Sequence, residues 1–267
     1  MKHLRRKIGF FALPCVILFM LLYVLPFFIT VAYSLLGNAF NMAFVGTDNY
    51  VSVFNNQYFR MALRNTVQVT CVLVVVTAIL SITLGFFLQH RKGKGLGVLI
   101  LLILPMLVPS VSCAAIWRNV FHTDSFTSAL TCYMALASLC AWKYTGISAV
   151  MLYAGLQDIN PQLLDAAALD GAGTIRTYLQ ISLPCIRNHI AIVLMLILMF
   201  VLRVYKESYL LFGLYPSDEM YLLAHYMSNH FIKMNYQNVA VSSVCLAVMG
   251  LLLAGLASLG RNKEETI

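Results

Sequence analysis

Charged residues are scarce in this 267-residue chain. Asp, Glu, Lys and Arg together make up 10% of it, whereas ordinary soluble domains carry roughly 25%. Hydrophobic residues make up 61%. These proportions exclude a typical soluble globular domain and indicate a membrane protein.

Motifs for catalysis are missing as well. The chain has no phosphate-binding G-x-x-x-x-G-K-[ST] loop, no H-E-x-x-H, no G-x-S-x-G and no paired carboxylate set. We therefore expect that it is not an enzyme and that it holds no cofactor of its own.

Patterns for metal sites and disulfides are also absent. The seven cysteines are an odd number without a C-x-x-C pair, and they are interpreted as small buried hydrophobic residues. His189, His225 and His230 lack metal-ligand spacing, so packed or solvated histidines are expected. The sequence predicts no metal site, and the net charge of +8 requires no nucleic-acid partner.

Long uncharged runs dominate what the chain does contain. Most reach the ~20 residues that a helix needs to cross a bilayer, and their apolar residues do not alternate as barrel strands would. We expect an all-α membrane protein, a single domain over 1–267, whose first run is an uncleaved span rather than a signal peptide. The expected transmembrane helices, about six, lie at approximately 8–36, 61–88, 96–118, 127–156, 185–212 and 239–260.

Prolines fall inside two of these spans and predict bends there. Pro14 and Pro26 lie in the first span, and Pro105 and Pro109 lie in the third. A proline frees a helix carbonyl that neighbours must satisfy, so it kinks or interrupts the helix. Packing kinks and a gating hinge both remain open.

Positive charge gathers in three clusters that predict the orientation of the chain. They comprise Lys2, Arg5, Arg6 and Lys7 before the first span, Arg91, Lys92 and Lys94 in a short link, and Arg261 and Lys263 after the last span. With six spans all three clusters fall on one side, which the positive-inside rule assigns to the cytoplasm. Both termini and the loop at 157–184 are then predicted to be cytoplasmic.

This loop carries signals for two short helices. Asn160 suits an N-cap, Pro161 suits the first helical turn, and Gly171 is placed to end the helix before a second start at Thr174. The first helix would present a small apolar face, made by Leu163, Leu164, Ala167 and Ala168. That face fits docking into a groove of another protein, or local packing at the membrane surface, and the residues alone leave both open.

The same loop contains a spaced set of residues, Asp165, Ala166, Ala167, Gly171, Ile181, Leu183 and Pro184. This set resembles the cytoplasmic signature of the membrane subunits of binding-protein-dependent ABC importers. The signature reads E-A-A, three residues, G, nine residues, I-x-L-P, and every spacing is kept here. The one departure is aspartate in place of glutamate.

The resemblance extends over nearly the whole chain, to the carbohydrate-permease branch of maltose and multiple-sugar type. It is carried by FVGTDNYVSVF, by LPMLVPSVSCAAIWRNVF and by WKYTGISAVMLYAGLQDINPQLLDAAALDGA. Two departures are the short link before the fourth span and FGLYPSDEMYLLAHYMSNHF, where T-x-G-G-P usually follows the fifth. The resemblance therefore covers fold and coupling, and does not identify the cargo.

The resemblance implies a type I ABC importer permease fold in the inner membrane of a prokaryotic cell. It implies a second permease subunit in a heterodimer, two cytoplasmic ABC ATPase subunits that bind ATP and Mg²⁺, and an extracytoplasmic substrate-binding protein. The seven signature residues would form the ATPase-coupling site, and the cargo would be a sugar or oligosaccharide. The alternative is an ion-coupled secondary transporter of a small polar solute, which would leave the signature unexplained.

Ionisable residues inside the predicted spans suggest a functional site, because charge is costly at membrane depth. Arg203 and Glu207 are four residues apart and can pair along one helical face. The candidate substrate-pathway residues are Lys143, Arg203, Lys206, Glu207 and Tyr209. One reading is a polar wall on which tyrosine rings stack against a sugar; the other is internal ion pairs, with Lys143 bound to a neighbouring helix, and an interfacial aromatic belt.

Overall fold

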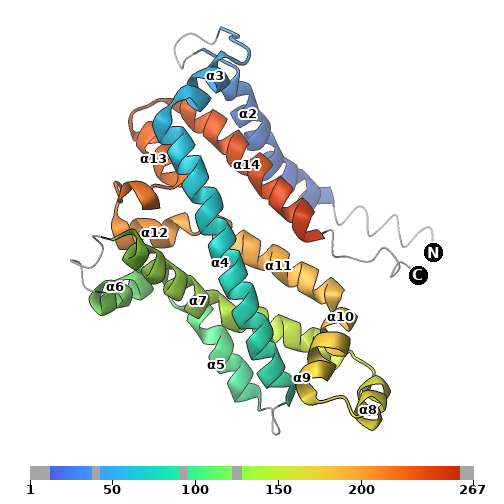
Figure 1. The fold of residues 1–267 in the computed structure, drawn as a ribbon. Coiled ribbons are helices and arrows are strands. Elements are labelled where there is room, and N and C mark those ends of the chain that lie inside the picture. Colours follow the sequence, from blue (N-terminus) through green and yellow to red (C-terminus); the bar gives the residue numbers. More distant parts are fainter. Residues whose placement is uncertain (1–12, 38–42, 91–94, 122–127, 259–267) are drawn as a thin grey trace, which may run out of the picture. The chain divides into compact units, whose positions relative to one another are not determined.

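The computed structural model describes residues 13–37, 43–90, 95–121 and 128–258. Five helices in these ranges are long and apolar enough to cross a membrane: Leu13–Ser34, Gln57–His90, Ala129–Gln157, Arg187–Phe212 and Tyr236–Ala257. A bent pair, α5 (Leu96–Leu107) and α6 (Ser110–Phe121), completes up to six spans. The predicted all-α membrane fold with about six spans is confirmed (Figure 1).

The elements follow one another along the chain in the order that Figure 1 colours and labels. The long ones are η1 (Met20–Val24) with α2 (Leu25–Ser34), α4 (Gln57–His90), α7 (Ala129–Gln157), α11 (Arg187–Leu202) with α12 (Tyr205–Phe212), and α14 (Tyr236–Ser258). The short ones are α3 (Asp48–Asn55), α8 (Pro161–Leu169), α9 (Thr174–Thr177), η3 (Tyr178–Ser182), α10 (Leu183–Cys185), η4 (Asp218–Met220) and α13 (Leu223–Ile232). The three basic clusters of the sequence lie outside the described residues.

Proline accounts for the sharpest bend. Val108, the residue before Pro109, leaves the helix with φ −69° and ψ 130°, the extended conformation that a following proline favours. The axes of α5 and α6 consequently meet at 87°. In the first span a widened π-helical turn, η1, directly precedes α2, whose first turn contains Pro26. The expected interruption of the third span is confirmed at Pro109, while Pro105 is accommodated inside α5.

The chain forms two compact units. The first contains the described residues up to Ala62 together with Tyr226–Val248, and the second contains Leu63–His225 with the described residues from Met249 onward. In the first unit, the amide of Asn49 donates to the carbonyls of Ser34 and Leu36 at 2.9 and 2.7 Å. The link after the first span is therefore fastened to the end of α2.

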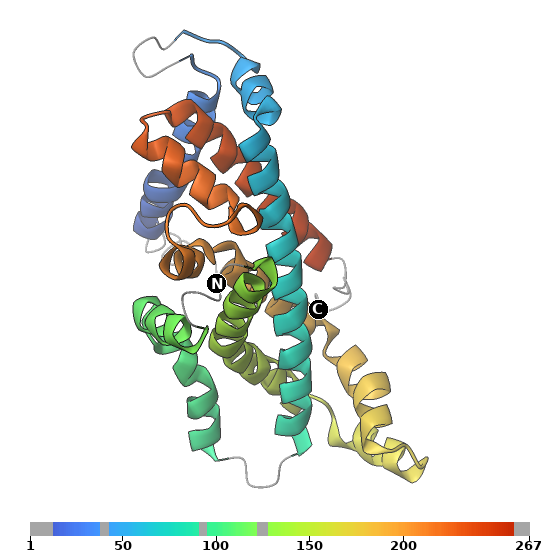
Figure 2. The same ribbon diagram turned by 60° about the vertical axis from the view of Figure 1, so that its left-hand side comes forward.

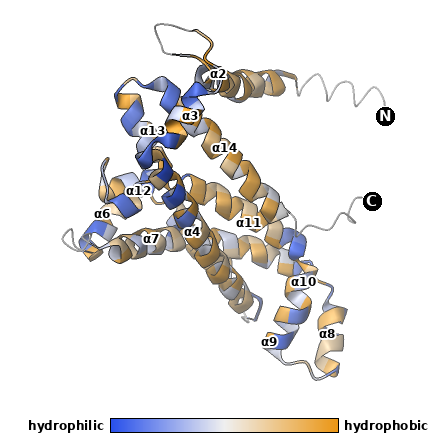
Figure 3. Cartoon of the chain, turned by 45° about the horizontal axis from the view of Figure 1, so that its top comes forward, coloured by the Kyte–Doolittle hydropathy of each residue, from blue (hydrophilic) through white to orange (hydrophobic). Residues whose placement is uncertain are grey.

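The second unit is organised around α7, which packs against α5, α6, α11 and α12 (Figure 2). Its close packing with α5 depends on Gly146, where a Cβ atom would overlap the carbonyl oxygen of Leu102. The core includes large apolar side chains of α7 such as Leu136, Leu139 and Leu152. Hydrophobic colouring dominates α11 and α14, and hydrophilic colouring gathers on α13 and α9 (Figure 3).

Cysteine burial follows the prediction only in part. Cys113, Cys132 and Cys140 are buried, as expected of small hydrophobic residues. Cys15, Cys71 and Cys185 are exposed, so the prediction is wrong for them. Cys15 and Cys71 lie on outward faces of apolar helices, where sequence hydrophobicity reports contact with lipid as readily as contact with a protein core.

Candidate functional site

The loop at 157–184 contains the helices that its capping residues predict. The side chain of Asn160 accepts a hydrogen bond from the backbone N–H of Gln162 at 3.0 Å, and α8 begins at Pro161. The helix ends at Leu169, and Gly171 follows its C-cap with a φ of +74°, in the left-handed region that favours glycine. The N–H of Ala172 then donates back to the carbonyl of Ala167 at 3.0 Å, which closes the end of the helix.

Most of the signature is exposed. Asp165 and Ala166 stand on the exposed side of α8, whereas Ala167 is buried. Of the expected apolar face, Leu164 is half-buried and Ala168 is exposed. Ile181 and Leu183 are half-buried, and Gly171 and Pro184 are exposed. The loop thus keeps the acidic start of the signature accessible while one alanine fixes α8 in place.

Large apolar side chains are exposed on the same loop. Leu169 is 89% exposed, and Leu163, Ile175 and Leu179 are exposed as well. The loop lies outside the candidate membrane spans. Large apolar side chains left exposed in this way are candidates for contact with a partner.

The two spans that flank the loop contact each other near its two ends. His189 Nε2 lies 3.8 Å from Asp158 Oδ2, and the His189 ring packs directly on Gly155. A Cβ atom at position 155 would lie 2.6 Å from Cγ of His189. The end of α7 and the start of α11 are therefore held together where the loop begins and ends.

A second group of predicted residues forms a buried charge cluster. Lys143 Nζ lies 3.0 Å from Glu207 Oε1, and the two side chains are only 5% and 4% exposed. The hydroxyl of Ser110 donates to Glu207 at 2.9 Å and accepts from Lys143 at 2.9 Å. The hydroxyl of Tyr144 donates to Glu207 at 3.2 Å. Each charge is thus paired and hydrogen-bonded, as a buried charge must be.

The cluster lies where two spans are broken. Ser110 opens α6 just after the bend at Pro109, and Glu207 lies in the first turn of α12, just after α11 ends at Leu202. The sequence left open a pair of Glu207 with Arg203; in the structure Glu207 pairs with Lys143 and Arg203 is exposed. The reading in which Lys143 binds a neighbouring helix is the one observed.

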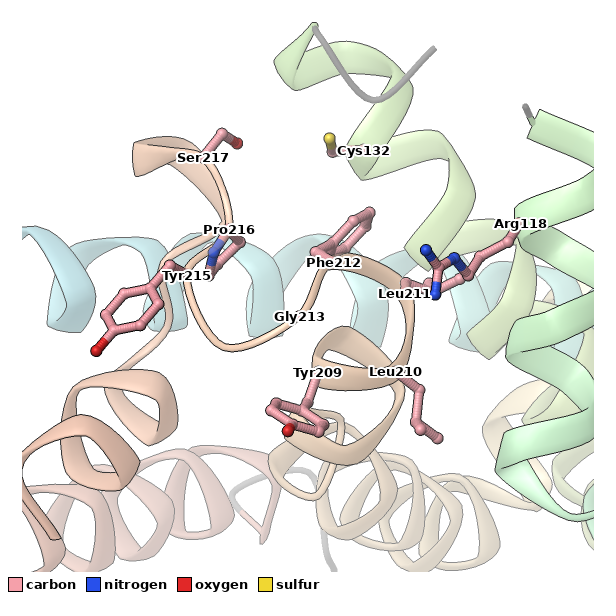
Figure 4. A pocket seen from close by; sticks show the side chains of 10 residues that line it. All are labelled: Arg118, Cys132, Tyr209, Leu210, Leu211, Phe212, Gly213, Tyr215, Pro216 and Ser217. Carbon is pink, nitrogen blue, oxygen red and sulfur yellow. The ribbon is translucent and has the colours of Figure 1, made fainter. Parts of the chain in front are cut away.

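The remaining pathway candidates face outward. Arg203 and Lys206 are exposed, and Tyr209 is 43% exposed. Tyr209 lines a cavity of about 400 Å³ together with Arg118 of α6, Cys132 of α7, Leu210–Gly213 and Tyr215–Ser217 (Figure 4). Tyrosine, arginine and serine around one hollow supply a flat apolar ring and hydrogen-bonding groups, which suits a polar, ring-shaped ligand.

Sequence reasoning missed Arg118. It falls at the end of the predicted span 96–118, in WRNVF, and the signal that could have found it is a lone arginine ending an uncharged run. Gly213 and Tyr215–Ser217 were equally missed, because their part in the cavity follows from the turn after α12, where Gly213 has φ +81°.

His225 is packed, one of the two environments expected for the histidines. Its side chain is fully buried, and Nδ1 accepts the N–H of Leu222 at 3.2 Å. Burial lowers the pKa of His225 to about 4, so the ring is neutral near pH 7. No group of three His, Cys, Asp or Glu residues suited to a metal ion occurs in the described part of the chain.

A family model described as "Binding-protein-dependent transport system inner membrane component" matches residues 78–259. The chain belongs to this family. It is therefore a membrane component of binding-protein-dependent transport, and the resemblance read from the loop signature is confirmed.

Several curated relatives are permeases of sugar transport systems. The arabinooligosaccharides permease AraP of Bacillus subtilis is 29% identical over 189 residues, 64% of this chain and 60% of AraP. The sulfoquinovosyl glycerol permease SmoG of Agrobacterium fabrum is 25% identical over 77% of this chain and 72% of SmoG. The trehalose/maltose permease MalF of Thermococcus litoralis is 28% identical over 64% and 63%. The match to this chain spans less than two thirds of AraP and MalF.

The fold also matches solved structures. A chain of a bacterial ABC transporter involved in the import of the acidic polysaccharide alginate aligns with a TM-score of 0.79, 21% identity and 99% of both chains covered. The same kind of transporter in complex with an alginate pentasaccharide-bound periplasmic protein gives a TM-score of 0.80, with 97% and 95% covered. The predicted ABC importer permease fold is confirmed.

In this permease-family chain all but two of the predicted site residues fall into three places. The signature residues lie together on the exposed loop, Lys143 and Glu207 lie together in the buried charge cluster, and Tyr209 lines the cavity with Arg118. Arg203 and Lys206 join neither the cluster nor the residues that line this cavity.

Proposed function

We propose that this chain is a permease subunit of an ATP-driven ABC importer and forms half of the translocation pathway for a sugar or oligosaccharide. The observation that carries this proposal is the loop at 157–184. Asp165, the first residue of the signature, is exposed outside the spans. The apolar side chains of Leu163, Leu169 and Ile175 are exposed there as well. A short helix with exposed apolar groups suits a groove on a soluble protein, here the ATPase.

The proposed assembly contains a second, different permease subunit, two cytoplasmic ABC ATPase subunits and an extracytoplasmic binding protein. The description of the family supports the binding protein. ATP and Mg²⁺ would be bound by the ATPase subunits, because this chain has no phosphate-binding loop of its own. Both termini and the loop at 157–184 would lie in the cytoplasm, and lipid would surround the spans.

The cargo and its path are part of the same proposal. The names of the relatives, which include arabinooligosaccharides and trehalose/maltose, support a saccharide. We infer that Tyr209 and Arg118 contact the cargo at the cavity. We infer that the exposed side chains of Arg203 and Lys206 also face the pathway, away from this cavity. Lys143 and Glu207 serve the scaffold instead, because their charges are already satisfied by one another.

The ion-coupled alternative gains no support from the family to which the chain belongs. The two readings also predict opposite results in one experiment. Uptake into proteoliposomes that hold the complete complex should require ATP inside the vesicle if the proposal is right. Uptake that persists without ATP, or a chain that never co-purifies with ATPase subunits, would support the alternative.

Gly171 gives the sharpest test of the coupling loop. In Gly171→Val the valine must adopt a φ near +74°, which costs about 1–2 kcal/mol for a residue with a side chain and should reduce ATPase binding and uptake about tenfold. Gly173→Val is the matched control, because Gly173 has φ −69° and open space around it. Equal effects of the two variants on ATPase co-purification would contradict the role of the loop geometry.

A further inference from the structure

Tyr178 points inward from the loop while its neighbours point outward. The side chain of Tyr178 is 4% exposed, whereas those of Ile175 and Leu179 are 66% and 55% exposed. Tyr178 also begins η3, a π-helical turn, and such widened turns occur preferentially at functional positions. One large polar side chain of the loop is therefore buried at the place where the helical geometry of the loop changes.

The partner of Tyr178 is the backbone of the second span. The Tyr178 hydroxyl donates to the carbonyl of Ile82 at 2.8 Å, across 96 residues of sequence. A carbonyl oxygen has two lone pairs, so this bond coexists with the bond inside α4. Because the acceptor is a main-chain carbonyl, the hydrogen bond joins the loop to the backbone of α4 and not to a side chain that can rotate away.

The Tyr178 side chain packs directly on the surface of α4. At Gly85 an added Cβ atom would lie 3.5 Å from Tyr178 Oη, an ordinary contact distance, so the hydroxyl lies against this turn of the helix. The ring of Phe86 packs edge-on against the Tyr178 ring, with centroids 5.0 Å apart. Burial raises the pKa of Tyr178 to about 12, which keeps the hydroxyl protonated as a donor at neutral pH.

We propose that Tyr178 is a positioning residue that transmits movement of the ATPase-facing loop to the second span through its hydrogen bond to Ile82. This inference rests on the proposed function, since it assumes that ATPase subunits bind the exposed side of the loop. When those subunits displace the loop, α4 is carried along at Ile82. Without the hydroxyl the loop can move while α4 lags behind.

The test compares Tyr178→Phe with Thr83→Val in the complete complex. Tyr178→Phe keeps the ring against Phe86 and removes only the hydroxyl. Thr83→Val removes another hydroxyl bonded to an α4 carbonyl, that of Ile79 at 2.8 Å, which makes no link to the loop. In proteoliposomes we expect Tyr178→Phe to lower cargo imported per ATP hydrolysed about threefold to tenfold, the factor corresponding to one ordinary hydrogen bond. Thr83→Val should leave this ratio unchanged.

Amide hydrogen exchange of the detergent-purified chain tests the hydrogen bond of Tyr178 in the absence of the ATPase subunits. Tyr178→Phe should speed exchange across residues 174–183, and Thr83→Val should not. Unchanged exchange in Tyr178→Phe, or faster exchange with an unchanged ratio of import to hydrolysis, would overturn the proposed role. If the wild-type chain recruits no ATPase, the proposed function and the transmission role both fail, while the exchange result still decides whether Tyr178 holds the loop on α4.

Discussion

The ion pair of Lys143 and Glu207 is best understood through the groups around it. A buried salt bridge is weak evidence for stability, because desolvation of both charges offsets their attraction. Here the hydroxyls of Ser110 and Tyr144 supply additional hydrogen bonds to the pair, and the Tyr144 ring stacks on Phe200 at 4.7 Å. The cluster therefore specifies how α6, α7 and α12 meet, rather than adding much net stability.

Removing one charge should cost far more than removing both. Lys143→Met would leave Glu207 buried without its cation, and we expect a loss of about 3–5 kcal/mol in the free energy of unfolding. The double variant Lys143→Met, Glu207→Leu should recover most of that loss. Thermal melting of the purified chain gives the measurement, with Lys206→Met as the control because Lys206 is exposed. Additive losses in the double variant would show that the two charges do not depend on each other.

Lys143 and Glu207 also show which properties of single residues the sequence could predict. Charge inside an apolar run identified Lys143 and Glu207 as unusual, and pairing across helices was one of the readings open for Lys143. The partner of Glu207 could not be read from spacing, because Lys143 is 64 residues away along the chain. The break before α12 turns Glu207 towards α7, and that turn depends on packing rather than on local sequence.

Helix ends and breaks follow local chemistry where that chemistry is strong. Asn160, Pro161 and Gly171 delimit α8 as their capping preferences predict, and Pro109 interrupts the third span. The break between α11 and α12 has no such signal. There Arg203 and Val204 donate to carbonyls three residues earlier, a tighter turn without proline or glycine, so sequence predicted an uninterrupted fifth span.

The close contact between α5 and α7 should be disrupted by a single methyl group added at Gly146. In Gly146→Ala the new Cβ would overlap the Leu102 carbonyl oxygen, and backbone cannot yield as a side chain can, so we expect a loss of about 1–3 kcal/mol or more. Gly97→Ala, in α5 with open space around it, should be neutral or stabilise by up to about 1 kcal/mol. Chemical or thermal unfolding of both variants decides the matter, and equal stability would show that the two helices separate freely.

At the scale of the whole molecule, the first span stands out. The most apolar stretch of Leu13–Ser34 has none of its residues buried within the chain. Either lipid or a second permease subunit could cover such a helix. Coverage by a second subunit is consistent with a chain that forms half of a pathway. Hydrophobicity predicted that this segment spans the membrane. It could not predict what covers the helix, because contact with lipid and contact with protein both require an apolar composition.

The orientation of the molecule can be tested by labelling from one side. The proposal places Gly173, in the loop at 157–184, in the cytoplasm, and Ser217, in the link after the fifth span, on the opposite side. Both positions are exposed, so a cysteine at either should react readily with a maleimide. In a background with the seven native cysteines replaced by alanine, Ser217→Cys should be labelled in intact spheroplasts by a membrane-impermeant maleimide. Gly173→Cys should be labelled only after the membrane is opened. The reverse pattern would place the loop outside the cell, where no ATPase could reach Asp165 or the exposed side chains beside it.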